Sequence, residues 1–140
     1  VEQLVVEVGV PILGVCVGMQ MLANSSEEGK LPGLGWVDGN VKKFNVTSML
    51  QSQNLPHMGW NNVTTETEGG LFKDIKGENK FYFLHSYYFD CYQESNIIGV
   101  TDYGFNFTSA IKKKNIFGVQ FHPEKSHRYG GQLLKNYSEI

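Results

Sequence analysis

The sequence predicts a single α/β domain, and three observations support that prediction. An apolar run at residues 10–15 leads through a glycine-flanked turn into a short helical segment at residues 19–23. A series of β-forming runs follows between residues 36 and 121. The chain then closes with an amphipathic helical segment at residues 129–137, which places Leu133 and Leu134 on its inner side.

The predicted elements follow from local patterns in chain order. An amphipathic segment at the start is expected to be the end of a helix that stops at Gly9. Residues 10–15 are continuously apolar, as buried parallel strands are. Residues 25–33 and 47–54 are polar and are expected to be loops. Further strands are expected at residues 36–44, 62–65, 80–84 with an extension through 87–92, 97–103, 107–111 and 116–121, with a helical turn at 70–75 and a lysine-rich hairpin turn at 112–115.

Composition narrows the class of protein. The chain has 140 residues, of which 41% are hydrophobic and 19% are charged, and these values are typical of one soluble globular domain. The formal net charge of −2 gives no reason to expect nucleic acid or an anionic membrane as a partner. No apolar run is long enough to cross a bilayer. Cys16 and Cys91 are expected to be reduced thiols of a cytoplasmic protein.

The first chemical feature is the run Gly14-Val15-Cys16-Val17-Gly18, between the first strand and the following helix. A nucleophile at such a junction stands on a tight turn, where flanking glycines prevent crowding. The helix N-terminus is expected to favour the thiolate of Cys16. The backbone N–H of Val17 is expected to face the oxyanion of a tetrahedral intermediate. A buried cysteine with a purely structural role is the alternative.

The second feature, His122-Pro123-Glu124, directly follows the strand expected at residues 116–121. A cysteine nucleophile needs a base, and the base needs an acceptor that orients its ring. His122 is suited to be the base, with Glu124 holding the far ring nitrogen. A surface histidine beside a helix-capping glutamate is the alternative for this feature taken alone.

Together, the two features resemble the signature of the class I glutamine amidotransferases. They read Gly-Val-Cys-Val-Gly-Met-Gln at residues 14–20 and Gly-Val-Gln-Phe-His-Pro-Glu-Lys-Ser at residues 118–126. The resemblance implies a mostly parallel open sheet flanked by helices, with flavodoxin-like layering, over residues 1–140. It also implies hydrolysis of the glutamine side-chain amide, in which Cys16 attacks the amide carbon, His122 transfers protons and Glu124 orients His122.

Further segments resemble one branch of that family, the glutaminase subunit of imidazole glycerol phosphate synthase. They are Ser-Glu-Glu-Gly at residues 26–29, Leu-Pro-His-Met-Gly-Trp-Asn at 55–61 and Phe-Leu-His-Ser-Tyr-Tyr at 83–88. The resemblance implies that Gln20 and Glu28 hold the amino-acid end of glutamine. The residues that it implies for the rest of the glutamine pocket are Gly18, His85, Ser86 and Tyr87. Those that it implies for the surface facing a (β/α)8 synthase (cyclase) subunit, in a heterodimer, are His57, Met58, Trp60 and Asn61.

No cofactor is expected, and no metal either, because His85 has no companions at zinc-like spacing. Two other functions stay open. The first is the same chemistry feeding ammonia to an enzyme that amidates nucleotide sugars of surface polysaccharides, a branch that the run at residues 125–131 would suit. The second is an inactive binding or regulatory module with the same fold, although the presence of Cys16, His122 and Glu124 argues against it. The Gly-rich loop that supplies the family's second oxyanion donor is not found in the sequence, so we expect an N-terminal part of the domain, including strands, to precede Val1.

Overall fold

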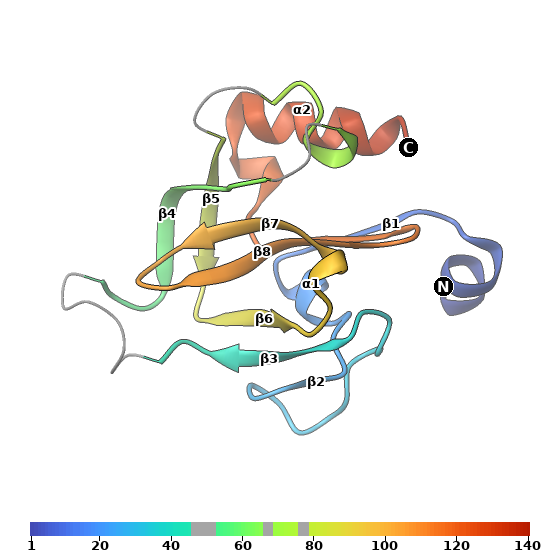
Figure 1. Ribbon diagram of the computed structural model, residues 1–140, viewed down its shortest axis with the longest axis horizontal. Helices are drawn as coiled ribbons and strands as arrows, with labels where there is room; N and C mark the ends of the chain where they lie inside the picture. The colour runs from blue at the N-terminus through green and yellow to red at the C-terminus, as the bar shows by residue number, and fades with distance from the viewer. Residues whose placement is uncertain (46–52, 66–68, 76–78) are drawn as a thin grey trace.

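The computed structural model describes residues 1–45, 53–65, 69–75 and 79–140 (Figure 1). The helical elements are η1 (Gln3–Val8), α1 (Val17–Gln20), η2 (Gly70–Phe72), η3 (Glu94–Asn96), η4 (Pro123–Lys125) and α2 (His127–Ser138). The strands are β1 (Ile12–Val15), β2 (Ser25–Ser26), β3 (Gly39–Lys43), β4 (His57–Asn62), β5 (Lys80–His85), β6 (Tyr87–Cys91), β7 (Ile97–Asp102), β8 (Asn106–Lys113) and β9 (Ile116–Val119). Among the described residues, no helix is long and apolar enough to span a membrane.

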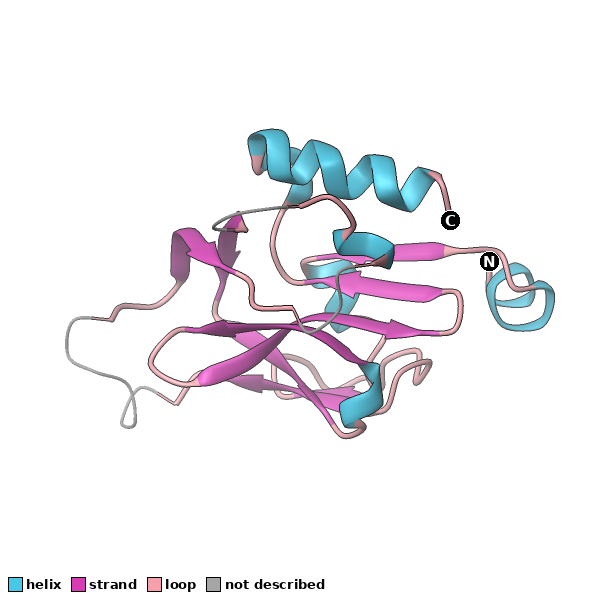
Figure 2. Ribbon diagram, turned by 45° about the horizontal axis from the view of Figure 1, so that its top comes forward, coloured by secondary structure: helices cyan, strands magenta, loops and turns pink. Residues whose placement is uncertain are grey.

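The strands form two sheets. The larger has the order β1-β9-β8-β6-β3-β2, with β7 also paired to β8, and the smaller is the antiparallel pair β4–β5. In Figure 1, β4 and β5 run across the direction of β6, β7 and β8. Figure 2 shows α2 lying outside the strands along one side of the molecule. The predicted α/β class is therefore confirmed.

The larger sheet is mixed, and in this it departs from the mostly parallel sheet expected. The pairs β1–β9 and β2–β3 are parallel, whereas the pairs that β8 makes with β6, β7 and β9 are antiparallel. The connections explain the difference. Strands joined by a short turn, such as β8 and β9, must run in opposite directions, because a parallel pair needs a long crossover between its strands.

Two strand predictions need correction. The stretch at residues 80–92 breaks at Ser86 into β5, which pairs with β4, and β6, which joins the larger sheet. The strand expected at residues 62–65 lies earlier in the chain, as β4, because pairing to β5 begins already at His57. Most of the loop expected at residues 47–54 lies outside the described residues.

The core has two clusters of buried side chains. One gathers aromatic residues of β5, β8 and the segment after β9, namely Phe81, Phe83, Phe107 and Phe121, against Leu133 of α2. The other packs α1 and the loop after it against β3 and β6, through residues such as Met19, Leu22, Val37, Val41 and Phe89. Val15, which precedes the Cys16 turn, packs against the first cluster, and Met19, which follows it, belongs to the second. Phe121, which precedes His122, belongs to the first. The candidate site thus lies where the two clusters meet.

Candidate active site

Cys16 stands on a strained turn directly after β1. Its backbone has φ 54° and ψ −109°, a left-handed conformation that non-glycine residues rarely adopt. Its N–H donates to the carbonyl of Val119 in β9 at 2.8 Å, so the parallel β1–β9 pair fixes the base of the turn. A Cβ on Gly14 would lie 2.5 Å from the carbonyl oxygen of Gly18, whereas a Cβ on Gly18 would meet open space. Crowding therefore explains the glycine at position 14 only.

The thiol of Cys16 is half-buried and lies between two polar groups. Its S–H donates to the carbonyl of Leu84 at 3.8 Å, and the side-chain amide of Gln120 donates to its sulfur at 3.6 Å. Burial raises the pKa of the Cys16 thiol, and this outweighs the lowering by the backbone N–H of Val17 and by Gln120. The helix N-terminus was expected to favour the thiolate of Cys16, and the backbone N–H of Val17 does act in that direction, but desolvation outweighs it.

His122 and Glu124 form the pair that the spacing predicted. His122 Nδ1 lies 2.5 Å from Glu124 Oε1, and the imidazole is mostly buried while the carboxylate is half exposed. The turn is held by Ser126, whose hydroxyl donates to the carbonyl of His122 at 2.6 Å and accepts from the N–H of Tyr82 at 3.0 Å. With Nδ1–H donating to the carboxylate, the lone pair of His122 stands on Nε2. This contact fixes the orientation of the His122 ring, as a general base requires.

Strand β5 brings Cys16 and His122 to one of its edges. The carbonyl of Tyr82 accepts the backbone N–H of His122 at 2.9 Å, and the carbonyl of Leu84 accepts the thiol of Cys16. Residues two apart in a strand direct their carbonyls to the same side. The opposite edge of β5 is occupied by β4, with Trp60 paired to Tyr82 and Met58 paired to Leu84. One strand therefore separates the exposed side chains of β4 from Cys16 and His122.

A cavity of about 260 Å³ opens beside the nucleophile turn. Its lining includes Val17, Gln20 and Glu28, so two of the residues expected to hold glutamine do meet next to the Cys16 turn. Glu28 is exposed and offers a carboxylate, which suits an ammonium group. Gln20 directs its amide nitrogen away from solvent, onto the carbonyl of Tyr87 at 3.2 Å.

The histidines predicted for the pocket and for the interface form one buried pair. His57 Nδ1 lies 2.9 Å from His85 Nε2, and both rings are buried. His85 Nδ1 donates to the carbonyl of Tyr87 at 2.7 Å, which leaves His85 Nε2 to accept from His57. The amide of Asn61 then donates to His57 Nε2 at 3.2 Å. His57 therefore does not face a partner, since the ring lies between Phe83 and Tyr103.

Desolvation keeps both rings neutral. Burial lowers the pKa of His57 to about 3, with a further lowering by His85. Burial also lowers the pKa of His85 to about 4, although its hydrogen bond to Tyr87 acts in the opposite direction. Neutral rings are what the hydrogen-bond pattern requires, because each ring has one donor and one acceptor nitrogen.

Of the four residues expected at a partner surface, two are exposed. Met58 is 61% exposed and Trp60 is 47% exposed, and the indole of Trp60 stacks on the ring of His127 at 5.2 Å. Asn61 is partly buried and holds His57 and the carbonyl of Asp102. The exposed apolar surface on β4 and β5 is completed by Leu84.

Sequence reasoning missed Gln120 and Ser126. Gln120 has no exposed surface and contacts the sulfur of Cys16, and buried Ser126 ties the His122 turn to β5. A signal was present for Gln120, because it is the one polar residue in the otherwise apolar run of residues 116–121. Ser126 ends the motif at residues 118–126, but its role was not readable there, since Tyr82 lies far away in the chain.

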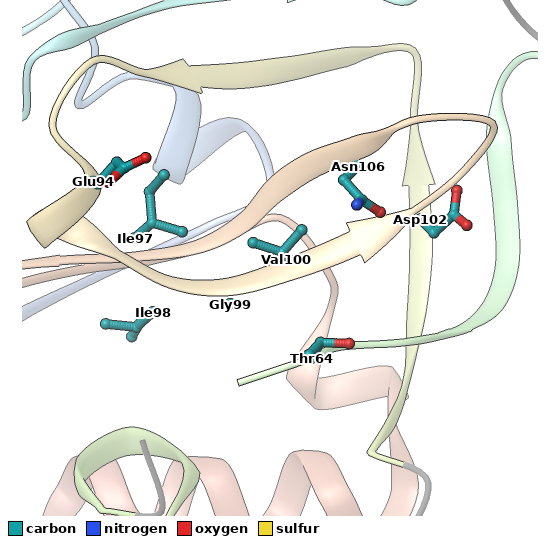
Figure 3. Close-up of a pocket in the computed structure, with 8 residues that line it drawn as sticks. All are labelled: Thr64, Glu94, Ile97, Ile98, Gly99, Val100, Asp102 and Asn106. Carbon is teal, nitrogen blue, oxygen red and sulfur yellow. The ribbon is translucent and has the colours of Figure 1, made fainter. Parts of the chain in front are cut away.

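A larger cavity, of about 450 Å³, lies elsewhere, on the strand β7 (Figure 3). Its walls come from residues such as Thr64, Ile98, Val100 and Asp102 and include no member of the predicted triad. Within the described ranges, no three His, Cys, Asp or Glu side chains converge as metal ligands would. The cavity on β7 therefore adds no group to the chemistry at Cys16.

Comparison with known proteins identifies the family. The family model described as glutamine amidotransferase class-I matches residues 1–138. A protein of Bdellovibrio bacteriovorus, imidazole glycerol phosphate synthase subunit HisH, is 52% identical over 139 residues, which cover 99% of this chain and 68% of that protein. The protein of the same name from Leptospira interrogans is 49% identical, with the same coverage of both chains.

Solved structures show the same fold at low identity. A glutamine amidotransferase from Thermotoga maritima superposes with a TM-score of 0.63 at 17% identity, over 96% of this chain and 50% of that one. A GMP synthase protein from Thermoplasma acidophilum gives a TM-score of 0.63 at 22% identity, over 91% of this chain and 55% of that one. The chain thus spans about half the length of these solved structures. By the family match and the identity to its relatives, it belongs to the class I glutamine amidotransferases.

Proposed function

We propose that residues 1–140 act as a glutaminase domain, which hydrolyses glutamine to glutamate and ammonia and supplies the ammonia to a synthase subunit in imidazole glycerol phosphate synthesis, in the cytoplasm. The observation that carries the chemistry is the shared anchoring of Cys16 and His122 to carbonyls of β5, with His122 paired to Glu124 at 2.5 Å. The names of the relatives support this acceptor over a nucleotide sugar. The presence of all three groups also argues against an inactive module.

The first half-reaction begins with a thiol, since burial raises the pKa of Cys16. His122 Nε2 accepts the proton while Glu124 holds Nδ1–H. The sulfur attacks the amide carbon of glutamine, and the N–H of Val17 donates a hydrogen bond to the oxyanion that forms. His122 then gives its proton to the amide nitrogen, and the C–N bond breaks. Ammonia departs, and a γ-glutamyl thioester remains on Cys16.

The second half-reaction returns the enzyme to its starting state. His122 Nε2 accepts a proton from water as the water oxygen attacks the thioester carbon. The C–S bond then breaks, glutamate leaves, and the sulfur regains its proton from His122. We expect Gln20 and Glu28 to hold the amino-acid end of glutamine during both steps, with Glu28 supplying the carboxylate for its ammonium group, and their position in the lining of the cavity beside the Cys16 turn supports this.

The partner surface is proposed for the exposed side chains of β4. Met58 and Trp60 are apolar and exposed, and aromatic anchors of this kind are frequent centres of protein interfaces. A (β/α)8 synthase subunit that docks here would contact the strand paired directly to β5. We therefore expect hydrolysis by the chain alone to be slow, and expect the partner together with its acceptor ligand to accelerate it.

The test measures glutamate released from glutamine by the chain with its synthase partner and acceptor ligand. Cys16→Ala should lower the rate by about 10⁴-fold to 10⁶-fold, because a nucleophile that works within a triad is lost. Cys91→Ala is the matched control and should leave the rate unchanged, since Cys91 lies at the end of β6 and bonds to the carbonyl of Gln93. Hydrolysis that survives in Cys16→Ala would overturn the assignment of the nucleophile.

A further inference from the structure

We propose that Gln120 is a further catalytic residue, which holds the sulfur of Cys16 through its side-chain amide, and that Gln20 is the positioning residue that aims this amide. The inference deepens the proposed glutaminase function and rests on it, because it names a group that acts on the nucleophile of that reaction. It does not depend on which synthase receives the ammonia.

Gln120 lies between β9 and His122, and its side chain is completely buried. Its Nε2 is 3.6 Å from Cys16 Sγ, a normal separation for a hydrogen bond to sulfur. Its backbone N–H donates to the carbonyl of Ser109 at 2.8 Å, which fixes the residue in the sheet. A buried amide is costly unless its polar atoms are bonded, and here the sulfur is the acceptor for the amide nitrogen.

The orientation of the Gln120 amide follows from a fixed acceptor further away. The carbonyl of Tyr87 can only accept, so the side-chain group of Gln20 that lies 3.2 Å from it must be the nitrogen. The second hydrogen on that nitrogen points to Gln120, at 3.0 Å, and therefore requires the oxygen of the Gln120 amide. With its oxygen facing Gln20, Gln120 presents its NH₂ group to Cys16.

This donor has a function that the triad does not fill. The N–H of Val17 also bonds to the sulfur. In the proposed mechanism, however, this N–H is the donor to the oxyanion of the tetrahedral intermediate. The carbonyl of Leu84 accepts the S–H and so favours the protonated thiol. Gln120 is then the group that stabilises negative charge on the sulfur, both when the thiolate attacks and when it leaves from the thioester.

The surrounding charges make such a donor useful. Glu124 in η4 and Glu28 in the loop after β2 both raise the pKa of Cys16, and burial raises it more than either. From β5, the group that faces the sulfur is the Leu84 carbonyl, which carries no charge. The two influences that lower the pKa are the N–H of Val17 and the amide of Gln120. Removing the amide should therefore shift the titration of Cys16 upward.

The experiment measures alkylation of the chain by iodoacetamide as a function of pH, with no glutamine present. Labelling of Cys16 and Cys91 is followed separately by mass analysis of their peptides. Cys91 is the internal control, because the substitutions should leave its labelling unchanged. Gln120→Met removes the amide at nearly constant volume. We expect it to raise the midpoint of Cys16 labelling by about one pH unit, and to slow labelling at neutral pH by roughly tenfold.

Gln20→Met leaves Gln120 in place and should shift the same midpoint in the same direction by a smaller amount, because the amide of Gln120 is then free to rotate. It also carries the test if Gln120→Met fails to fold, since Gln20 is only partly buried. Gln132→Met, on α2, is the matched control and should leave the Cys16 midpoint unchanged. An unchanged midpoint in folded Gln120→Met, or in Gln20→Met where that variant carries the test, would overturn the proposal. No glutamine is hydrolysed in this assay, so an unchanged midpoint would not argue against the proposed glutaminase function. Conversely, a chain that lacks glutaminase activity could still show the shift of the Cys16 midpoint, so the two proposals fail separately.

Discussion

Gly14 and Gly18 flank the nucleophile symmetrically in the sequence, but the structure crowds only one of them. A Cβ on Gly14 would collide with backbone atoms of Gly18, and backbone cannot move aside as a flexible side chain can. We expect Gly14→Ala to lower the free energy of unfolding by about 1–3 kcal/mol. Gly18→Ala adds its methyl group to open space and should change stability by less than about 0.5 kcal/mol. Urea unfolding of the two variants checks this, and equal losses would contradict it.

The two cysteines differ in their neighbours more than in their burial. Burial raises the pKa of both thiols, but only Cys16 has an amide donor on its sulfur and stands beside the edge of β5 that holds His122. A glutamine analogue with an electrophilic carbon at the amide position should therefore modify Cys16 and spare Cys91. Mass analysis of the two peptides gives the result, and preferential labelling of Cys91 would refute the assignment of the nucleophile.

At the scale of single residues, much of the candidate site could be predicted from the sequence. The nucleophile turn and the spacing of His122 and Glu124 depend on neighbours within a few residues, so a local pattern was enough to predict them. The protonation state of Cys16 was not readable, because it depends on desolvation by segments distant in the chain.

Among the elements, β4 and β5 are joined by more than their ladder. The buried pair of His57 and His85 adds a side-chain hydrogen bond between directly opposed positions, and Asn61 extends it to the carbonyl of Asp102. The pair requires both rings to stay neutral, since protonation of either ring would place two donors against each other. The strand that bears the proposed partner surface is thus held in register with the strand that holds the catalytic groups.

This pair predicts a pH dependence of stability. In the folded chain the pKa values are about 3 for His57 and about 4 for His85, below the value of about 6.5 expected in the unfolded chain. Between about pH 4 and pH 6.5 the unfolded state therefore binds more protons than the folded state. The contribution of the pair to the free energy of unfolding is complete above about pH 6.5 and is lost as the pH falls toward 4. Between pH 7 and pH 5, the His85→Asn variant should lose about 2 kcal/mol less of its free energy of unfolding than the unchanged chain does. Urea unfolding at several pH values is the measurement, with His127→Asn, which removes an exposed histidine, as the control.

Across the whole molecule, the surface and the site are separated by a single strand. Trp60 lies opposite Tyr82, whose carbonyl holds His122, and Met58 lies opposite Leu84, whose carbonyl faces Cys16. A partner bound to these side chains would act on the strand next to the reacting groups. The arrangement gives a short physical connection between the proposed docking surface and the nucleophile.

Trp60→Ala tests the docking surface. We expect it to weaken binding of the synthase subunit by at least about 2 kcal/mol if Trp60 is an interface anchor. Labelling of Cys16 in the free chain should not change, because the indole points to His127 and not to the sulfur. Tyr92→Ala removes another exposed aromatic ring, at the end of β6, and is the matched control. Affinity that stays the same in Trp60→Ala would remove this residue from the interface.

The sequence by itself determined the turn at Cys16 and the His122–Glu124 pair, because each depends on residues close together in the chain. It also determined the α/β class and the family, because these are encoded in the order and residue identities of local motifs, whose positions relative to one another in space are not needed to read them. Only the tertiary structure decided the mixed sheet, the burial of His57 and the contact of Gln120 with the sulfur of Cys16. These features depend on segments that lie tens of residues apart and meet only after packing. Hydrophobic periodicity shows that a residue is buried, but it does not show which distant atom the residue will contact.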